Sequence, residues 1–269
     1  MPETGANVDK EQAIARHLLA EHSTGKPFLT LEGELALADM AEAYRAQQIF
    51  VALSREARGA GIAGYKIALT SAAMQAFVGV DHPLLGAILD DTVFHAPAEI
   101  SLGAFQHVGV EFELALRLGR DVPPVAQPYN AVSIAPYVDA VIPAFELIED
   151  RNAVYENFDA RSLVADNAWS GAVVLGQPVT DWRGFDLAAT PTRLETGGEV
   201  ETATTGAALG NPLTALAWAA NELSAQGRPL EAGMIVMTGS TLKTRFPGAG
   251  ERFLYEVEGI GSVQMSIVP

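Results

Sequence analysis

The N-terminal part of the chain places its apolar residues at the spacing of an α-helix. From Asp9 to Glu21, Ile14 and Leu18 fall on one side of a helix, and a Gly and a Pro then interrupt the pattern. A second and longer run repeats every three or four residues before the Gly59-Ala60-Gly61 break, and it consists of Leu37, Met40, Ala41, Tyr44, Gln48 and Val51. We therefore expect residues 1–62 to form an N-terminal helical cap.

Beyond Gly64 the pattern changes to short apolar runs separated by Gly and Pro, which is typical of strands and turns. We expect strands within residues 64–69, 87–94, 107–118, 139–148, 170–176, 233–239 and 261–268. One late helix is expected from Pro212 to Gln226, where Asn211 can cap the first turn and Gly227 can end the last. The prediction is an α+β chain in which the helical cap joins a β-rich body, residues 63–269, as a single structural unit.

Composition narrows the class of protein. The chain has 269 residues, of which 49% are hydrophobic and 19% charged, and this excludes a disordered or low-complexity chain. Acidic residues outnumber basic ones by 33 to 17, so we expect no nucleic-acid partner. The lack of cysteine excludes disulfides, thiolate zinc sites and cysteine nucleophiles. No apolar run is long enough to span a membrane, and the polar N-terminus is unlike a targeting peptide, so we expect a cytoplasmic enzyme.

Strict alternation marks the strand expected at residues 107–118. Its even positions are all apolar: Val108, Val110, Phe112, Leu114, Leu116 and Leu118. Its odd positions include Glu111 and Glu113, which a period of two places on one face, about 6–7 Å apart. This face is either the solvated side of a half-buried strand or a pair of carboxylates gathered to bind a ligand.

Glu146 stands inside an apolar run, from Ala140 to Ile148, that leaves no clear solvated face. A buried carboxylate is unfavourable by several kcal/mol unless it is paired or holds a cation. Arg151 could be a purely structural partner for it. The alternative is that two strands bring Glu146 and the two other glutamates together around a divalent cation, for which oxygen ligands favour Mg²⁺ or Mn²⁺ over zinc.

Lys66 is one of only four lysines, and its neighbours Tyr65 and Ile67 are apolar. Its ammonium is therefore expected in a cleft or in an ion pair with a carboxylate. Two short segments, 164–167 (VADN) and 238–241 (TGST), place small polar groups beside apolar strands. Turn and cap chemistry is one interpretation of both segments, and the second also offers N–H groups and hydroxyls suited to a substrate carboxylate.

A set of ordered sequence blocks extends this picture. The blocks are GYKIALTSAAMQAFVGVDHPLLG, VEFELALRLGRDV, IPAFELIEDR, VADNAWSG and NPLTALAWAANELSAQGRPLEAGMIVMTGST, followed by GIGSV near the end. In these blocks the chain resembles the 2-keto-4-pentenoate hydratase family within the fumarylacetoacetate hydrolase superfamily. That group includes 4-oxalocrotonate decarboxylases. The resemblance implies a β-rich, rolled mixed sheet of the fumarylacetoacetate hydrolase C-terminal type, with a metal at its mouth.

The same resemblance implies roles for residues by motif position. Glu111 and Glu113 match the family's E-x-E metal ligands, Glu146 matches its third ligand, and Lys66 matches its active-site lysine, with Asp166 as the second acid/base candidate. The matching blocks also contain the residues expected to bind substrate, which are Thr70, Leu84, Asn167, Ser240 and Thr241.

Three positions depart from the family pattern. Leu84 stands where members often have an acid, and Ser162 stands where many have an acid four residues before Asp166. Trp169 follows A-D-N-A, where a small residue is usual. These changes bear on proton transfer and pocket size, and so on the reaction more than on the fold or the metal.

The resemblance implies a metal-dependent hydratase of aromatic catabolism, which adds water to a 2-hydroxy-2,4-dienoate to give a 4-hydroxy-2-oxo acid. Decarboxylation of 2-oxo-3-hexenedioate would use the same metal and Lys66, and its second carboxylate would need a cation from Arg151, Arg161, Lys243 or Arg245. An acylpyruvate C–C hydrolase and a non-catalytic partner subunit are further alternatives. We also expect a homo-oligomer that binds a small 2-oxo or 2-hydroxy acid, with a pathway partner enzyme left open.

Overall fold

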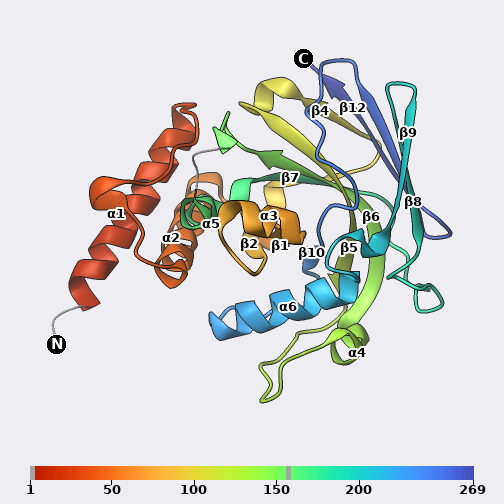
Figure 1. Ribbon diagram of the computed structural model, residues 1–269, viewed down its shortest axis with the longest axis horizontal. Coiled ribbons are helices and arrows are strands. Elements are labelled where there is room, and N and C mark those ends of the chain that lie inside the picture. The colour runs from red at the N-terminus through yellow and green to blue at the C-terminus, as the bar shows by residue number, and fades with distance from the viewer. Residues whose placement is uncertain (1–3, 156–158) are drawn as a thin grey trace.

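The computed structural model describes residues 4–155 and 159–269 (Figure 1). At one end of the molecule, helices α1 (Thr4–Ser23) and α2 (Met40–Arg58) pack against each other. The Asp39 side chain caps α2 by accepting a 2.8 Å hydrogen bond from a backbone N–H, and Gly59 ends the helix in the left-handed conformation. The two helices predicted for this region are therefore present. Within the described ranges, no helix is both long and apolar enough to cross a bilayer.

A seven-stranded mixed sheet forms the centre of the body. Its order is β2-β1-β10-β5-β6-β7-β3, with β1 parallel to β10, β3 parallel to β7 and the other neighbours antiparallel. The strands are β1 (Ile62–Ala68), β2 (Leu84–Leu89), β3 (Val93–His95), β5 (Val108–Leu118), β6 (Val138–Glu149), β7 (Ser170–Leu175) and β10 (Ile235–Met237). The long strands β5 and β6 are curved, so the sheet rolls up around its concave face (Figure 1).

A second sheet covers the other face of β5 and β6. Its order is β4-β12-β11-β8-β9, with β4 (Ala98–Ser101), β8 (Pro191–Thr196), β9 (Glu199–Thr204), β11 (Arg252–Val257) and β12 (Gly261–Val268). Phe112 of β5 and Phe145 of β6 pack against Phe253 of β11, with ring centroids 6.1 and 6.3 Å apart. The even-numbered side of β5 is therefore buried between two sheets.

The rolled mixed sheet and the N-terminal helices confirm the predicted fold class. The late helix is α6 (Pro212–Ala225), and the Asn211 side chain caps it by accepting a 2.8 Å hydrogen bond from the N–H of Leu213. Four strands and three short helices escaped the sequence analysis, namely β4, β8, β9, β11, α3 (Ala72–Val78), α4 (Ala131–Ile134) and α5 (Ala160–Ala165). In β9 every side chain is exposed or half-buried, so this strand lacks the apolar run that identifies the predicted strands.

The concave face of the first sheet has an apolar floor. Its buried side chains are Ile88, Ala115, Ile142, Ala144, Val173, Leu175, Ile235 and Met237. Along β5 and β6, the next residues on the same side are Glu113 and Glu146, because successive same-side positions are two residues apart. The fold thus places the Glu113 and Glu146 carboxyl groups next to a buried apolar surface.

Candidate active site

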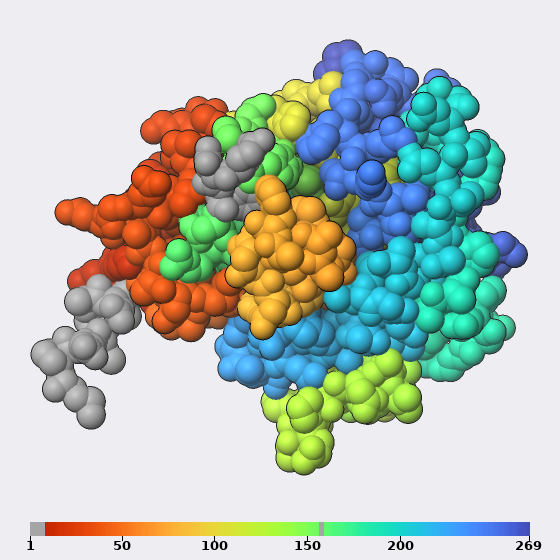
Figure 2. Space-filling view, viewed as in Figure 1, coloured from red at the N-terminus to blue at the C-terminus, as the bar shows by residue number. Residues whose placement is uncertain are grey.

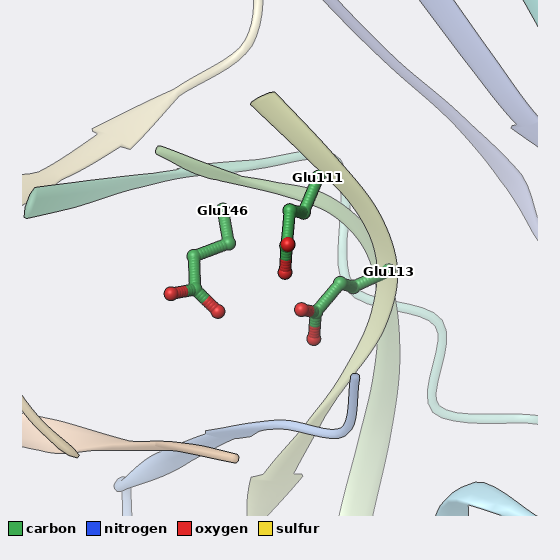
Figure 3. A group of neighbouring side chains, drawn as sticks. All are labelled: Glu111, Glu113 and Glu146. Atoms are coloured by element: carbon green, nitrogen blue, oxygen red, sulfur yellow. The ribbon is translucent and has the colours of Figure 1, made fainter. Parts of the chain in front are cut away.

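Three glutamates meet on the concave face of the rolled sheet. Glu111 and Glu113 lie on β5, and Glu146 lies on β6 as the register partner of Glu111. One carboxylate oxygen from each lies within 4.8 Å of the others, and Figure 3 shows the three side chains converging from the two strands. Such oxygens lie no more than about 2.8 Å from a shared point, which is close to the roughly 2.0–2.6 Å at which hard cations bind oxygen. The structure brings together the three carboxylates singled out in the sequence.

This face of β5 is not a solvated one. Glu113 is 0% exposed and Glu146 is 2% exposed. The interpretation of the odd-numbered side of β5 as the outer face of a half-buried strand is therefore wrong. Because the sheet rolls up, this side of β5 faces the enclosed interior while the second sheet covers the opposite side.

Only some of the carboxylate oxygens of the three glutamates have hydrogen-bond donors among the described residues. Glu111 Oε1 accepts a 2.6 Å hydrogen bond from the Thr244 hydroxyl, and Glu113 Oε2 accepts one of 2.8 Å from the N–H of Gly239. Glu113 Oε1 and Glu146 Oε2 are buried and accept no hydrogen bond from the described residues. Buried polar atoms are normally paired, so these oxygens have lone pairs free for a ligand.

Burial and mutual repulsion make the ionised site unfavourable on its own. Burial raises the pKa of Glu113 well above its ordinary value, and the charges of Glu146 and Glu111 raise it further. The pKa of Glu111 is also raised, first by burial and then by the charge of Glu146, while Lys66 and Thr244 oppose the shift. A divalent cation among three oxygen donors would offset both effects, so the residues present fit Mg²⁺ or Mn²⁺.

Lys66 is the cationic partner of Glu146. It enters from β1, is buried, and places Nζ 2.8 Å from Glu146 Oε1. The alternative in which Arg151 is a structural partner of Glu146 is wrong, because the Arg151 guanidinium donates to Asp166 at 2.9 Å instead. The chain turns away after β6, so Arg151 reaches the helical side of the molecule, where it also lies 3.5 Å from Glu21.

A cavity of about 1000 Å³ opens above the glutamates, and Lys66, Glu111, Thr70, Ser240 and Thr241 are among the residues that line it. Its rim includes Ser71 and Met74 at α3 and the segment 240–245, which Figure 2 shows on one face of the molecule in orange and blue. Lys66, one of the three glutamates and the three predicted hydroxyl residues thus share one space, whereas Glu113 and Glu146 are not among the lining residues.

The Ser240 and Thr241 hydroxyls of the TGST segment form hydrogen bonds within the protein. Ser240 Oγ accepts a 2.9 Å hydrogen bond from the N–H of Phe112 and donates one of 2.8 Å to the carbonyl of Leu242. Thr241 Oγ1 donates a 2.9 Å hydrogen bond to the carbonyl of Phe112. These bonds fasten the segment to β5 and place the N–H of Gly239 on Glu113. One of the N–H groups of this segment, that of Gly239, therefore binds a glutamate.

Leu84, Asp166 and Asn167 lie outside this cavity. Leu84 is fully buried in the apolar core. The Asn167 side chain bonds both backbone groups of Ala87, accepting from its N–H at 2.7 Å and donating to its carbonyl at 2.9 Å. Asp166 is 1% exposed, and its Oδ1 atom lies 2.6 Å from His22 Nε2. The structure therefore gives the two polar residues structural partners.

An unusual turn follows Asp166. Asn167, Ala168 and Trp169 have φ values of 54°, 50° and 56°, which is left-handed backbone that costs non-glycine residues about 1–2 kcal/mol each. A Cβ at Gly86 would lie 2.5 Å from the Asn167 carbonyl oxygen, so only glycine lets the turn approach β2 this closely. The turn presents Ala168 and Trp169 to the cavity.

Sequence reasoning missed several cavity residues. Thr244, which orients Glu111, gives no signal because its contact spans 133 residues. Ile148, Tyr155 and Leu163 also line the cavity. Of these, only Ile148 had a detectable signal, since it shares the strand face of Glu146 by a period of two.

Comparison with known proteins places these features in context. Residues 60–268 match the fumarylacetoacetate (FAA) hydrolase C-terminal family. The chain is 36% identical to 2-keto-4-pentenoate hydratase 2 of Dechloromonas aromatica (strain RCB), over 94% of this chain and 95% of that protein. It is 32% identical to a 4-oxalocrotonate decarboxylase of a Pseudomonas species, over 96% and 98%. The structure of 4-oxalocrotonate decarboxylase from Pseudomonas putida G7, complexed with magnesium and adipate, superposes with a TM-score of 0.88 at 27% identity, covering 97% and 98% of the two chains.

Proposed function

Since the chain belongs to the fumarylacetoacetate hydrolase C-terminal family, we propose that it is a metal-dependent hydratase of a 2-hydroxy-2,4-dienoate, forming a 4-hydroxy-2-oxo acid. The observation that carries the proposal is the convergence of three carboxylates, with two unsatisfied oxygens, beside the buried ammonium of Lys66. Relatives named as hydratases, from 33% to 36% identical, support the reaction class.

Glu111, Glu113 and Glu146 would hold one Mg²⁺ or Mn²⁺. When bound, the metal supplies Lewis-acid stabilisation of the negative charge that develops on the substrate's C2 oxygen. The Thr244 hydroxyl and the Gly239 N–H each bind one oxygen of a glutamate and leave the other oxygen of that carboxylate for the ion. The apolar floor beneath them excludes water from the far side of the site.

We assign Lys66 the proton transfer to the far end of the dienol. Protonation at C5 gives an α,β-unsaturated ketone, and water then adds at C4. The Glu146 carboxylate holds the Lys66 ammonium at 2.8 Å, which fixes its position at the cavity wall. Asp166, the other acid/base candidate, lies outside the cavity in its pair with Arg151, so its contribution is to position the turn that follows it.

The proposed activity is tested by following the ultraviolet absorbance of 2-hydroxypenta-2,4-dienoate with purified protein. We expect metal-dependent loss of the dienol absorbance and formation of 4-hydroxy-2-oxopentanoate, with both abolished by a chelator. A matched control is Glu113→Gln, which keeps the shape of the side chain and removes a ligand charge. No turnover with either Mg²⁺ or Mn²⁺ would contradict the proposal and favour a non-catalytic partner subunit.

Decarboxylation of 2-oxo-3-hexenedioate is the second proposed activity, and the TM-score of 0.88 to a decarboxylase favours retaining it. The same metal and lysine would serve the 2-oxo acid head of either substrate. Release of carbon dioxide from the dicarboxylate separates the two activities. Acylpyruvate hydrolysis gains no support, because none of His17, His22, His82, His95 and His107 lines the cavity.

We further propose that the chain forms a homo-oligomer, because its hydrophobic content is high, at 49% of residues, and because of its family membership. Sedimentation at micromolar concentration tests this, and a species of only 28.4 kDa would contradict it.

A further inference from the structure

We infer that the site selects substrates whose far end is uncharged and apolar, and that Trp169 is the residue that limits the size of that end. The inference rests on the proposed function, because it concerns the tail of the same 2-oxo acid. Its two grounds are the placement of the cationic side chains and the construction of the cavity wall.

A second carboxylate on the substrate would need a cationic partner. The arginines that could supply one lie outside the cavity or are already paired with protein carboxylates. Arg151 is buried against Asp166, and Arg161 lies outside the cavity with its guanidinium 3.2 Å from Asp159. Arg245 lines the cavity, but Glu201, which lines it too, pairs with its guanidinium, and Glu199 lies 3.4 Å from it.

Lys243 is the remaining candidate. It lines the cavity and is exposed, so solvent screens its charge. Lys66 is the buried lysine of the site, and it is committed to Glu146. Among the described residues, the cavity therefore offers a substrate tail no buried cation that is free of a carboxylate.

An apolar wall begins next to the metal site. Ile148 lies two residues beyond Glu146 on the same side of β6 and lines the cavity. Leu163 and Trp169, both buried, line it as well. A carboxylate placed against these side chains would lose hydration and gain no partner, whereas an alkyl or aryl group would gain contacts.

Trp169 is held rigidly in this wall. Its ring meets Phe28 edge-on with centroids 5.2 Å apart, and meets Tyr155 with centroids 5.5 Å apart. Its left-handed backbone is fixed by the preceding turn, in which Asn167 is bonded to β2 on both sides. Strained backbone persists where the surroundings over-determine it, and such places cluster at functional sites. Because the Trp169 ring is held by these contacts, it limits the size of the substrate's far end.

The test compares two non-reactive acids of equal length. Calorimetry with Mg²⁺-loaded protein measures binding of 2-oxohexanoate and 2-oxohexanedioate, which differ only in a terminal carboxylate. We expect 2-oxohexanoate to bind at least about 10-fold more tightly. Equal or tighter binding of the dianion would overturn the inference, as would a selective loss of dianion binding in Lys243→Met.

Variants at Trp169 test the size limit. In Trp169→Ala, binding of 2-oxo-6-phenylhexanoate relative to 2-oxohexanoate should rise at least about 10-fold. Trp169→Phe should give a smaller rise if the alanine variant fails to fold. Trp182→Phe, at a buried tryptophan outside the cavity, is the matched control and should leave the ratio unchanged. An unchanged ratio in both Trp169 variants would overturn the role of Trp169.

The binding result is independent of turnover, because neither acid has the carbon–carbon double bond to which the proposed enzyme adds water. Failure to turn over any dienoate would contradict the proposed function while the tail preference still stands or falls on binding. An active hydratase that prefers the dianion would contradict the inference alone. A protein that binds neither acid contradicts both.

Discussion

Two clusters of buried charge in this protein differ in how completely the protein satisfies them. In the first, the fully buried Arg151 donates to Asp166 at 2.9 Å and lies 3.5 Å from Glu21, while His22 contacts the same Asp166 at 2.6 Å. In the second, three glutamates face the single ammonium of Lys66, and two carboxylate oxygens accept no hydrogen bond from the described residues.

The difference fits a structural role for the first cluster and the proposed metal-binding role for the second. The Arg151 cluster joins the end of α1 to the turn before Trp169, so its charges serve the fold. The glutamate cluster has an excess of buried negative charge, and burial, together with the charges of Glu146 and Glu111, raises the pKa of Glu113. Because isolated buried charge is costly, the proposed divalent cation would offset the excess negative charge of this cluster.

Removing the cation of the structural cluster should have the largest effect on stability. Arg151→Met leaves Asp166 buried without its main partner, and we expect a loss of about 3–5 kcal/mol in the free energy of unfolding. Urea denaturation measures it. The double variant Arg151→Met/Asp166→Asn is the control, and it should regain much of the loss. A change below about 1 kcal/mol in the single variant would contradict the structural interpretation.

Removing the cation of the functional cluster should act on turnover instead. Lys66→Met keeps the apolar stem and removes the ammonium, and we expect kcat to fall by at least about 100-fold, as for loss of a positioned acid/base. Calorimetry should still detect Mg²⁺ binding by this variant. Near-normal turnover would reduce Lys66 to a structural partner of Glu146.

The smallest expected effect is the pH dependence of the free energy of unfolding that the glutamate cluster causes. Because the pKa of Glu113 is raised in the folded protein, the metal-free fold keeps a proton that the unfolded chain releases near pH 4.5. The free energy of unfolding of the metal-free protein should therefore fall as pH rises from 4.5 through the folded pKa. Between these two pKa values the fall should be on the order of 1.4 kcal/mol for each pH unit.

Thermal unfolding at a series of pH values, with and without Mg²⁺, measures this dependence. Saturating Mg²⁺ should reduce the decline, because the bound ion stabilises the ionised carboxylates. Glu113→Gln should also reduce it, without added metal. A metal-free protein whose stability rises over this range would show that the glutamates are not held in the protonated state.

The sequence predicted those parts of the site that local pattern determines. Strict alternation placed Glu111 and Glu113 on one side of a strand, and an apolar run marked Glu146 as buried. Their convergence depends on the pairing of β5 with β6, which adjacent antiparallel strands readily supply. The same local logic found α2 and α6, and for α6 it also identified the cap, Asn211.

The remaining features depend on contacts that no local pattern encodes. Proximity in sequence suggests Arg151 as the partner of Glu146, but its actual partner Asp166 lies beyond a turn and Glu21 lies on α1. The rolling of the sheet decides that the odd side of β5 is enclosed. The left-handed turn at Trp169 carries no glycine to announce it, so only the structure places that ring in the cavity.

The central claim is that Glu111, Glu113 and Glu146 bind one divalent cation. A crystal structure grown with Mn²⁺ and measured for anomalous scattering tests it most directly. We predict one strong peak between β5 and β6, with an oxygen of each glutamate at about 2.0–2.6 Å. No peak between these carboxylates at saturating Mn²⁺, or a peak bound by none of the three, would contradict the account.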